Sequence, residues 1–231
     1  LAARMGGALR HRGPDDEGFF VDWARNAAFH HARLSIIDLS PRGRQPMWNE
    51  TERLALLVNG EIYNYRELRS ELQRAGHRFH SLSDSETILH GYEEWGEAVF
   101  PRLRGMYAVA LYDRDTGTLV LARDPLGIKP LYLLHSNGGF AFASEARAFR
   151  ALPDDFWSFE LDTNRLDQML RFQYLPDRAG TLLRGVSKLP PGTVLTRRSD
   201  GACVQKTFWT LRPDPRVGSL SFEEAVAECE A

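Results

Sequence analysis

Three side chains of this sequence, an amide, a guanidinium and a carboxylate, carry groups suited to ligand binding. Asn59-Gly60-Glu61 joins an apolar run at 54–58 to a helix-like segment. Arg33 has a planar guanidinium that can make two parallel hydrogen bonds to a carboxylate, which Lys cannot. Asp84 stands in the predicted first turn of a helix, where a carboxylate is electrostatically favoured. Each feature alone has an ordinary explanation, as a turn dipeptide, a surface charge and a helix stabiliser.

Other familiar motifs are not found. The sequence holds no Gly-x-Gly-x-x-Gly after a strand, no Gly-x-x-x-x-Gly-Lys and no Gly-x-Ser-x-Gly. DRDTGTLVLARD resembles a calcium loop, but Gly117 stands where an oxygen ligand is needed, so we expect a hairpin turn. The seven His residues are scattered, and the adjacent His30 and His31 should point to opposite faces of a strand. We therefore predict no metal site.

The two cysteines give no sign of a disulfide framework. Cys203 and Cys229 are far apart and outside any Cys-x-x-Cys pattern. We interpret both as ordinary thiols.

Composition excludes several classes of protein. The 231 residues are 43% hydrophobic and 11% aromatic, enough for a substantial core, and the length suggests one large domain or one and a half. The net charge of -2, without a basic stripe, argues against a nucleic-acid partner. No apolar stretch approaches the roughly 20 residues that span a bilayer, and LAARMGGALRHRG lacks the features of a secretory signal. We expect no membrane partner and a cytoplasmic location.

The elements that must position these residues are mostly strands. Apolar runs predict strands at 27–37, 54–58, 106–112, 118–123, 130–135, 139–143 and 193–197. MYAVALYDRDTGTLVLARD reads as two strands joined by a polar turn, and the next two runs continue it as an antiparallel meander.

Helical spacing predicts three internal helices. We place one over 64–75, capped by Asn64 with Glu67 and stopped by Gly76, and one capped by Ser83 with Glu86 and running to Gly96. The third covers about 162–174. Their apolar stripes are predicted to lie in the core: Leu68 and Leu72; Ile88, Leu89, Tyr92 and Trp95; Leu166, Met169, Leu170 and Tyr174.

Both ends read as incomplete helices. Leu1, Met5 and Leu9 have helical spacing, and Ser221 with Glu224 is typical of a capping box. We expect a fragment: one domain at 1–211, a linker at 212–220 that holds two prolines and a glycine, and the start of a second domain at 221–231.

Eight motifs occur in an order and spacing similar to one protein family. Together they cover nearly the whole chain and resemble the amino-terminal glutaminase domain of glutamine-hydrolysing asparagine synthetases, a class II glutamine amidotransferase. The resemblance implies an α+β fold, a four-layer αββα sandwich of the amino-terminal-nucleophile hydrolase type. The motifs are HRGPDDEG (11–18), ARLSIIDLSPRGRQPM (32–47), VNGEIYNYRELRSEL (58–72), SDSETILHGYEEWG (83–96), LRGMYAVALYD (103–113), ARDPLGIKPLY (122–132), FASEARA (142–148) and KLPPGTVL (188–195).

The resemblance also implies roles for nine residues. The side-chain amide of Asn59 and the backbone N–H of Gly60 would form the oxyanion hole for attack on the glutamine amide. Arg33 would bind the α-carboxylate of glutamine and Asp84 its α-ammonium group. The rest of the pocket would be lined by Glu61 and by Leu34, Ser35, Ile36 and Ile37.

The nucleophile departs from the family pattern. Family members use a Cys as the first residue of the mature chain, and its α-amino group, with a reference pKa of about 7.7–8.0, takes up the proton. Here residue 1 is Leu, and Cys203 and Cys229 stand near the opposite end. We expect the family's Cys upstream of Leu1, and we predict that residues 1–231 alone do not hydrolyse glutamine.

The resemblance leaves three functions open. In the first, ammonia passes to a C-terminal domain, absent here, that uses ATP and magnesium to convert aspartate to asparagine; this fragment itself needs no cofactor. The second is an amidotransferase with another acceptor. The third is a non-catalytic domain, as in β-lactam-forming relatives that lack the nucleophile. A homodimer is possible under each of them.

Overall fold

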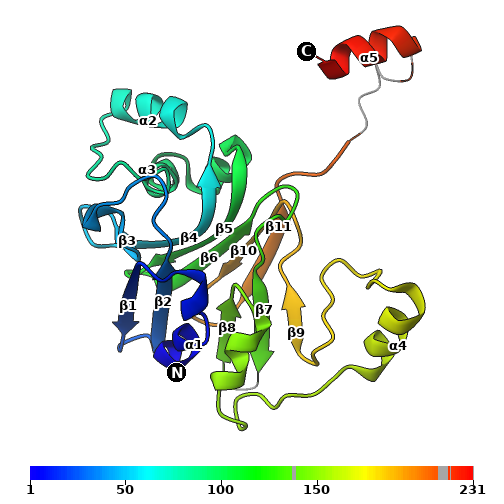
Figure 1. The fold of residues 1–231 in the computed structure, drawn as a ribbon. Coiled ribbons are helices and arrows are strands. Elements are labelled where there is room, and N and C mark those ends of the chain that lie inside the picture. The colour runs from blue at the N-terminus through cyan, green and yellow to red at the C-terminus, as the bar shows by residue number, and fades with distance from the viewer. Residues whose placement is uncertain (137–138, 213–217, 219, 231) are drawn as a thin grey trace.

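The computed structural model describes residues 1–136, 139–212, 218 and 220–230, and their strands form three antiparallel sheets (Figure 1). The largest has six strands in the order β11-β10-β6-β5-β4-β3. Its strands are β3 (Met47–Trp48), β4 (Leu54–Ile62), β5 (Gly105–Asp113), β6 (Thr118–Arg123), β10 (Thr193–Arg197) and β11 (Cys203–Thr207). The smaller sheets are β1 (Asp16–Asp22) with β2 (Ala27–Arg33), and β8 (Gly139–Ala143), β7 (Tyr132–Ser136) and β9 (Val186–Lys188).

The central strand β4 shows how the layers arise from alternation. Successive side chains of a strand point to opposite faces. Leu56 and Val58 pack with residues of α2 (Tyr65–Arg74) and α3 (Glu86–Trp95). Ala55 and Leu57 pack on the other face against residues of β2, β7 and the segment after β9. Both faces of β4 are therefore buried, which explains its continuous apolar run.

A fourth layer covers the second group of strands. Leu134 of β7 and Ala143 of β8 pack with Phe149 of a 3₁₀ segment, η4 (Ala146–Ala151). Met5 of α1 (Ala2–Gly7) and Leu9 cover the same cluster. The order helix, sheet, sheet, helix is the αββα sandwich that the resemblance implies.

The predicted hairpin at 113–118 is confirmed. Asp113 Oδ1 accepts hydrogen bonds from the backbone N–H groups of Asp115 and Thr116, and Gly117 N–H donates to Asp113 O. β5 and β6 pair on either side of this turn.

The strand prediction at 27–37 is too long. β2 ends at Arg33, and residues 34–37 form a loop. At this point the Arg33 guanidinium donates to backbone carbonyls of the loop that follows. Leu34 and Ile36 are consequently exposed instead of lying in a sheet.

Two predicted helix caps are wrong, although the helices themselves are confirmed. Asn64 stands before α2, but its side chain bonds Arg102 O and Arg104 N–H. Glu86 is the first residue of α3, and its carboxylate accepts from the backbone N–H groups of His80 and Ser81. In both cases a neighbouring loop competes for the side chain that would have capped the helix.

The apolar stripe predicted for the third helix is not core. α4 (Thr163–Phe172) forms and is capped by Asp162, which accepts from Arg165 N–H. It has no buried residue, and Leu170 and Tyr174 are 74% and 61% exposed. Helical periodicity identifies an apolar face, but it does not supply a surface to cover it.

The C-terminal part agrees with the predicted capping box. Ser221 N–H donates to the Glu224 carboxylate, and Glu224 N–H donates to Ser221 Oγ. This cap begins α5 (Phe222–Glu230). The predicted linker at 212–220 lies mostly outside the described residues, and so does the side chain of Cys229.

Candidate functional site

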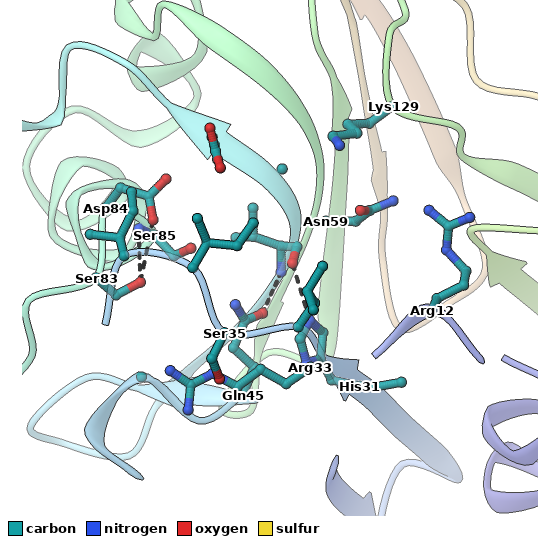
Figure 2. A pocket seen from close by; sticks show the side chains of 18 of the residues that line it. Arg12, His31, Arg33, Ser35, Gln45, Asn59, Ser83, Asp84, Ser85 and Lys129 are labelled. Carbon is teal, nitrogen blue, oxygen red and sulfur yellow. Dashed lines mark hydrogen bonds between the residues drawn. The ribbon is translucent and has the colours of Figure 1, made fainter. Parts of the chain in front are cut away.

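One cavity of about 250 Å³ brings the predicted site residues together (Figure 2). Its walls come from β2 and the loop after it, the C-terminal half of β4, and the segment that leads into α3. All nine residues assigned from the resemblance line it: Arg33, Leu34, Ser35, Ile36, Ile37, Asn59, Gly60, Glu61 and Asp84. Segments far apart in the sequence thus meet in a space of the size that a small metabolite needs.

The Asn59-Gly60 pair belongs to a regular strand rather than a turn. β4 continues to Ile62, and Gly60 pairs with Tyr107 of β5. A Cβ atom at residue 60 would lie 2.0 Å from Met106 O, so only glycine allows this close approach. The Asn59 amide extends to within 3.4 Å of Ser144 Oγ, a long contact that leaves the amide available to a ligand.

Two side chains replace a neighbouring strand beside Asn59. β3 pairs only with Ala55 and Leu56, so the edge of β4 is open at Val58. Gln45 Oε1 accepts from Val58 N–H at 2.6 Å, and the His31 ring lies 3.1 Å from Val58 O. These contacts fix the peptide that precedes the predicted oxyanion hole.

Arg33 is buried at the base of the loop that forms one wall. Its guanidinium donates to Ser40 O at 2.9 Å and to Asp38 O. The Asp38 carboxylate in turn accepts from Ser40 N–H and from Leu82 N–H, both at 2.8 Å. Asp38 therefore ties the loop that holds Arg33 to the segment that holds Asp84.

Asp84 lies just before α3, not in its first turn as predicted. Its Oδ2 accepts from Ile62 N–H at 2.7 Å, at the end of β4, and the residue is 5% exposed. Burial raises the pKa of the Asp84 carboxyl above its usual value of 3.8, and the nearby Glu61 carboxylate acts in the same direction. A buried carboxylate without a cation partner is costly, so a bound ammonium group would offset this cost.

His31 is held neutral at the cavity wall. Burial lowers its pKa to about 4, with Arg33 and His30 acting in the same direction. The neutral ring donates from Nε2 to Val58 O, which leaves Nδ1 as a buried acceptor without a protein partner among the described residues.

The cavity also contains residues to which we assigned no role from sequence. Arg12 and Lys129 line it near Asn59 (Figure 2), and so does Ser144. Arg12 is paired with Glu145 at 2.8 Å, and Lys129 adds a positive charge. Each lies inside a quoted motif: HRGPDDEG, ARDPLGIKPLY and FASEARA. The motifs marked these segments, but nothing in the sequence indicated which side chains face the cavity.

Lys129 is positioned by a buried carboxylate at the end of β6. Asp124 Oδ1 accepts from the N–H groups of Leu126 and Ile128, and Oδ2 accepts from those of Lys129 and Tyr107. Arg123 closes the same loop by donating to Gly127 O and Lys129 O. These hydrogen bonds hold the loop after β6, within the motif ARDPLGIKPLY, close to the end of the strand.

The cysteine with a described side chain is remote from this chemistry. Cys203 is exposed on β11, and it is not among the cavity-lining residues. A search of the described residues found no helix with the length and apolar character that crossing a membrane requires.

Comparisons with known proteins point to one family. The family model described as "Glutamine amidotransferase domain" matches residues 1–209. The chain is 40% identical over 215 residues to asparagine synthetase [glutamine-hydrolyzing] 1 of Bacillus subtilis, covering 93% of this chain and 33% of that protein. It is 43% identical over 206 residues to a putative asparagine synthetase [glutamine-hydrolyzing] of Mycobacterium tuberculosis strain H37Rv, covering 86% and 31%.

The fold comparison reaches a more distant enzyme. The glutamine phosphoribosylpyrophosphate amidotransferase of B. subtilis, solved with ADP and GMP, superposes with a TM-score of 0.65 at 19% identity, covering 90% of this chain and 46% of that one. This likeness confirms the predicted fold class. The chain spans about a third of the length of the curated relatives it matches. The chain belongs to the glutamine amidotransferase domain family, because the family model matches residues 1–209 and the relatives named above are 40% and 43% identical to it.

Proposed function

We propose that this domain hydrolyses glutamine to glutamate and ammonia within a longer asparagine synthetase. The observation that carries the proposal is the meeting of Arg33, Asn59, Gly60 and Asp84 around one cavity. The names of the curated relatives favour aspartate as the acceptor of the ammonia.

Recognition of glutamine follows from the charges at the cavity. Arg33 binds the α-carboxylate, and Asp84 binds the α-ammonium group. Binding of the ammonium group compensates the buried Asp84 carboxylate, whose pKa is raised in the free protein. Two opposite charges at separate walls orient an amino acid in a single direction, so its side-chain amide extends toward Asn59.

The oxyanion forms next to the end of β4. As the amide carbonyl is attacked, its oxygen gains negative charge, which the Asn59 amide and the Gly60 N–H stabilise. Because both donors are held by β4 before the reaction, they need no reorganisation, and one such donor typically contributes about 2.7–4 kcal/mol. The nucleophile that the resemblance implies is an N-terminal Cys; residue 1 of this sequence is Leu, so we assign the reaction to the full-length protein.

The second half of the reaction belongs to the part of the relatives that this chain does not match. We propose that a C-terminal domain binds ATP and magnesium there, activates aspartate as an adenylate and receives the ammonia. Residues 1–231 then need no cofactor of their own. The proposed location of the enzyme is the cytoplasm, and a homodimer stays a prediction.

The test is an assay of the full-length protein with ATP, aspartate and either glutamine or ammonia. Wild type should form asparagine from both nitrogen sources. Release of glutamate without asparagine would favour another acceptor. Failure with glutamine but success with ammonia would favour a non-catalytic domain.

Two variants separate binding from catalysis in that assay. Arg33→Lys should raise the KM for glutamine, because a single ammonium cannot bond a carboxylate through two parallel N–H groups. Asn59→Ala should lower kcat about 100- to 1,000-fold with little change in KM. Ammonia-dependent synthesis should survive both changes; equal loss with both nitrogen sources would show that the variants act through folding instead.

A further inference from the structure

We propose that His77, His90 and Glu93 form a binding site for a divalent transition metal, with Zn²⁺ as the expected ion. One ligand atom from each of these residues lies within 4.8 Å of the other two. His90 and Glu93 lie on α3, His77 lies in the segment that follows α2, and none of them lines the glutamine cavity. The site differs from the sequence-based prediction of no metal site, and nothing in the glutaminase chemistry requires it.

The ligand atoms face one another. His90 Nδ1 lies 2.8 Å from Glu93 Oε2, and His77 Nδ1 lies 3.7 Å from the same oxygen. Ligands of a tetrahedral zinc ion lie about 2.0–2.2 Å from the metal and so roughly 3.3–3.5 Å from one another. The His90–Glu93 distance is shorter than this value and the His77–Glu93 distance is longer. Shifts of a few tenths of an ångström would bring both pairs to the spacing of zinc ligands.

The opposite atoms of His77 and Glu93 have partners that orient them, and that of His90 lies near a carboxylate. His77 Nε2 lies 3.2 Å from Glu94 Oε2, and Glu93 Oε1 accepts from Asn49 Nδ2 at 2.8 Å. His90 Nε2 lies 3.5 Å from Glu86 Oε1. Metal-bound histidines almost always donate their other N–H to a carboxylate or carbonyl. The arrangement therefore leaves Nδ1 of both histidines and one oxygen of Glu93 for the ion.

Burial argues that this cluster is built into the fold. The His90 side chain is 1% exposed and lies edge-on to the Phe79 ring, with 4.7 Å between centroids. Its Nε2 has no hydrogen bond of good geometry among the described residues, although Glu86 is near. Glu86 cannot turn freely to it, because its carboxylate accepts from the N–H groups of His80 and Ser81.

The charges around the cluster favour a dication. Glu86, Glu93 and Glu94 lie against the two histidines, whereas Arg69 is the cation that contacts Glu86, at 3.7 Å. Two imidazoles and one carboxylate suit Zn²⁺, and the partly exposed edge at His77 leaves a fourth position to water.

The proposed role is structural. The ion would join the segment at 76–80 to α3, the helix whose preceding residues include Asp84. Metal binding to the folded protein stabilises it by mass action.

The experiment uses the whole chain after treatment with a chelator and dialysis. ZnCl₂ is titrated by calorimetry, and CoCl₂ by the visible absorption of tetrahedral Co²⁺. Wild type should bind one ion with a Kd on the order of 1 µM or tighter. Glu94→Gln should weaken binding about 10- to 100-fold, as expected for a partner that orients a ligand. His77→Gln should abolish the Co²⁺ spectrum.

A matched control is His80→Gln, which replaces an exposed histidine three residues from His77 and should bind like wild type. Because His77 is partly exposed, its variant should remain folded, and circular dichroism checks this. A wild-type protein with no Co²⁺ spectrum and an unchanged Tm in excess Zn²⁺ would show that the cluster is an ion-pair network only. Equal binding by wild type and His77→Gln would place the ion elsewhere. Both results would overturn the proposal.

Discussion

At the scale of single residues, the proposed binding roles come with a cost to the stability of the free protein. Asp84 holds a buried carboxylate that accepts one N–H from the end of β4. Arg33 is buried and bonded to loop carbonyls before any substrate arrives. Charges held in this way are oriented in advance, so less ordering is required when an amino acid binds.

Asp84→Asn should raise stability and weaken glutamine binding. The pKa of Asp84 is raised above 3.8 in the folded protein, so the folded state holds this proton more tightly than the unfolded state. Folding stability therefore falls as the pH rises above 3.8, and the loss is complete once the pH exceeds the folded-state pKa. The neutral Asn keeps an oxygen for Ile62 N–H. We therefore expect a higher Tm than wild type at pH 7 and a difference that shrinks as the pH approaches 4.

Thermal unfolding at several pH values checks this, together with the KM for glutamine in the full-length protein. A lower Tm at pH 7 would mean that the carboxylate stabilises the free protein, contrary to the direction of its pKa.

His31 should make the fold sensitive to mild acid. Its pKa is about 4 in the folded state and about 6.5 unfolded, so protons bind the unfolded chain first as the pH falls. Stability is lost between pH 6.5 and 4, by at most ~3 kcal/mol. His31→Gln keeps a donor for Val58 O but has no group that titrates in this range. Its stability should therefore not show this additional loss between pH 6.5 and 4.

Urea unfolding of both proteins at pH 7 and 4.5 measures the effect. Other titrating groups contribute equally to the two proteins, so parallel losses would contradict a neutral buried His31.

At the scale of elements, loops position the site by using buried acceptors in place of regular pairing. Asp124, at the end of β6, accepts four backbone N–H groups, and Asp38 accepts two from separate segments. A carboxylate suits this role because both of its oxygens accept hydrogen bonds. These hydrogen bonds therefore hold the loops in a fixed position relative to the sheet.

Asp124→Asn should be strongly destabilising. The amide replaces one acceptor oxygen by a donor, so two of the four N–H groups lose their partner. Hydrogen bonds to charged groups contribute about 1.5–3 kcal/mol each, which gives an expected loss of ~3–6 kcal/mol.

The control for this variant is Asp115→Asn. The Asp115 side chain is exposed, and its contact with Arg53 is long at 3.8 Å, so the change should stay within about 0.5 kcal/mol. Equal effects in chemical denaturation would refute the role of Asp124.

The sequence predicted the buried elements better than the exposed ones. Long apolar runs such as 54–58 and 106–112 identified β4 and β5 because their side chains are buried on both faces. β11 was not predicted because it is an edge strand with every residue exposed. β3 has two residues and carries no periodicity. For α4 the periodicity was correct and the inferred burial was wrong.

The site was predictable only through the motifs. Arg33, Asn59 and Asp84 are separated by tens of residues, and no local pattern shows that their elements converge. The His77, His90 and Glu93 cluster was missed for the same reason, since His77 follows α2 whereas its partners lie on α3. Pairing between distant segments depends on tertiary packing, which periodicity does not contain.

At the scale of the whole molecule, residues 1–212 should be self-sufficient. The three buried clusters use residues from Met5 to Phe208. In α5, Phe222 is 79% exposed, and none of its described side chains joins a cluster. The domain boundary at 211–212 stays a prediction.

A chain that ends at Arg212 should therefore keep the stability of the longer one. We expect the Tm to change by less than about 2 °C, because 1 kcal/mol shifts the Tm of a protein of this size by about 2–4 °C. Calorimetry of both chains measures this. A drop of 5 °C or more would show that residues beyond 212 pack on the domain.

The placement of Asn59 and Gly60 within β4 has a consequence for how such a domain can diversify. The part that would handle the reactive amide is embedded in the sheet, between the core residues Val58 and Ile62. The groups that would recognise the amino-acid end lie beside two loop segments: Arg33 ends β2 and is bonded to the segment at 34–43, and Asp84 belongs to the segment at 81–85. We expect replacement of these segments, in evolution or by design, to direct the domain to a different amide while Asn59 and Gly60 keep their place in β4.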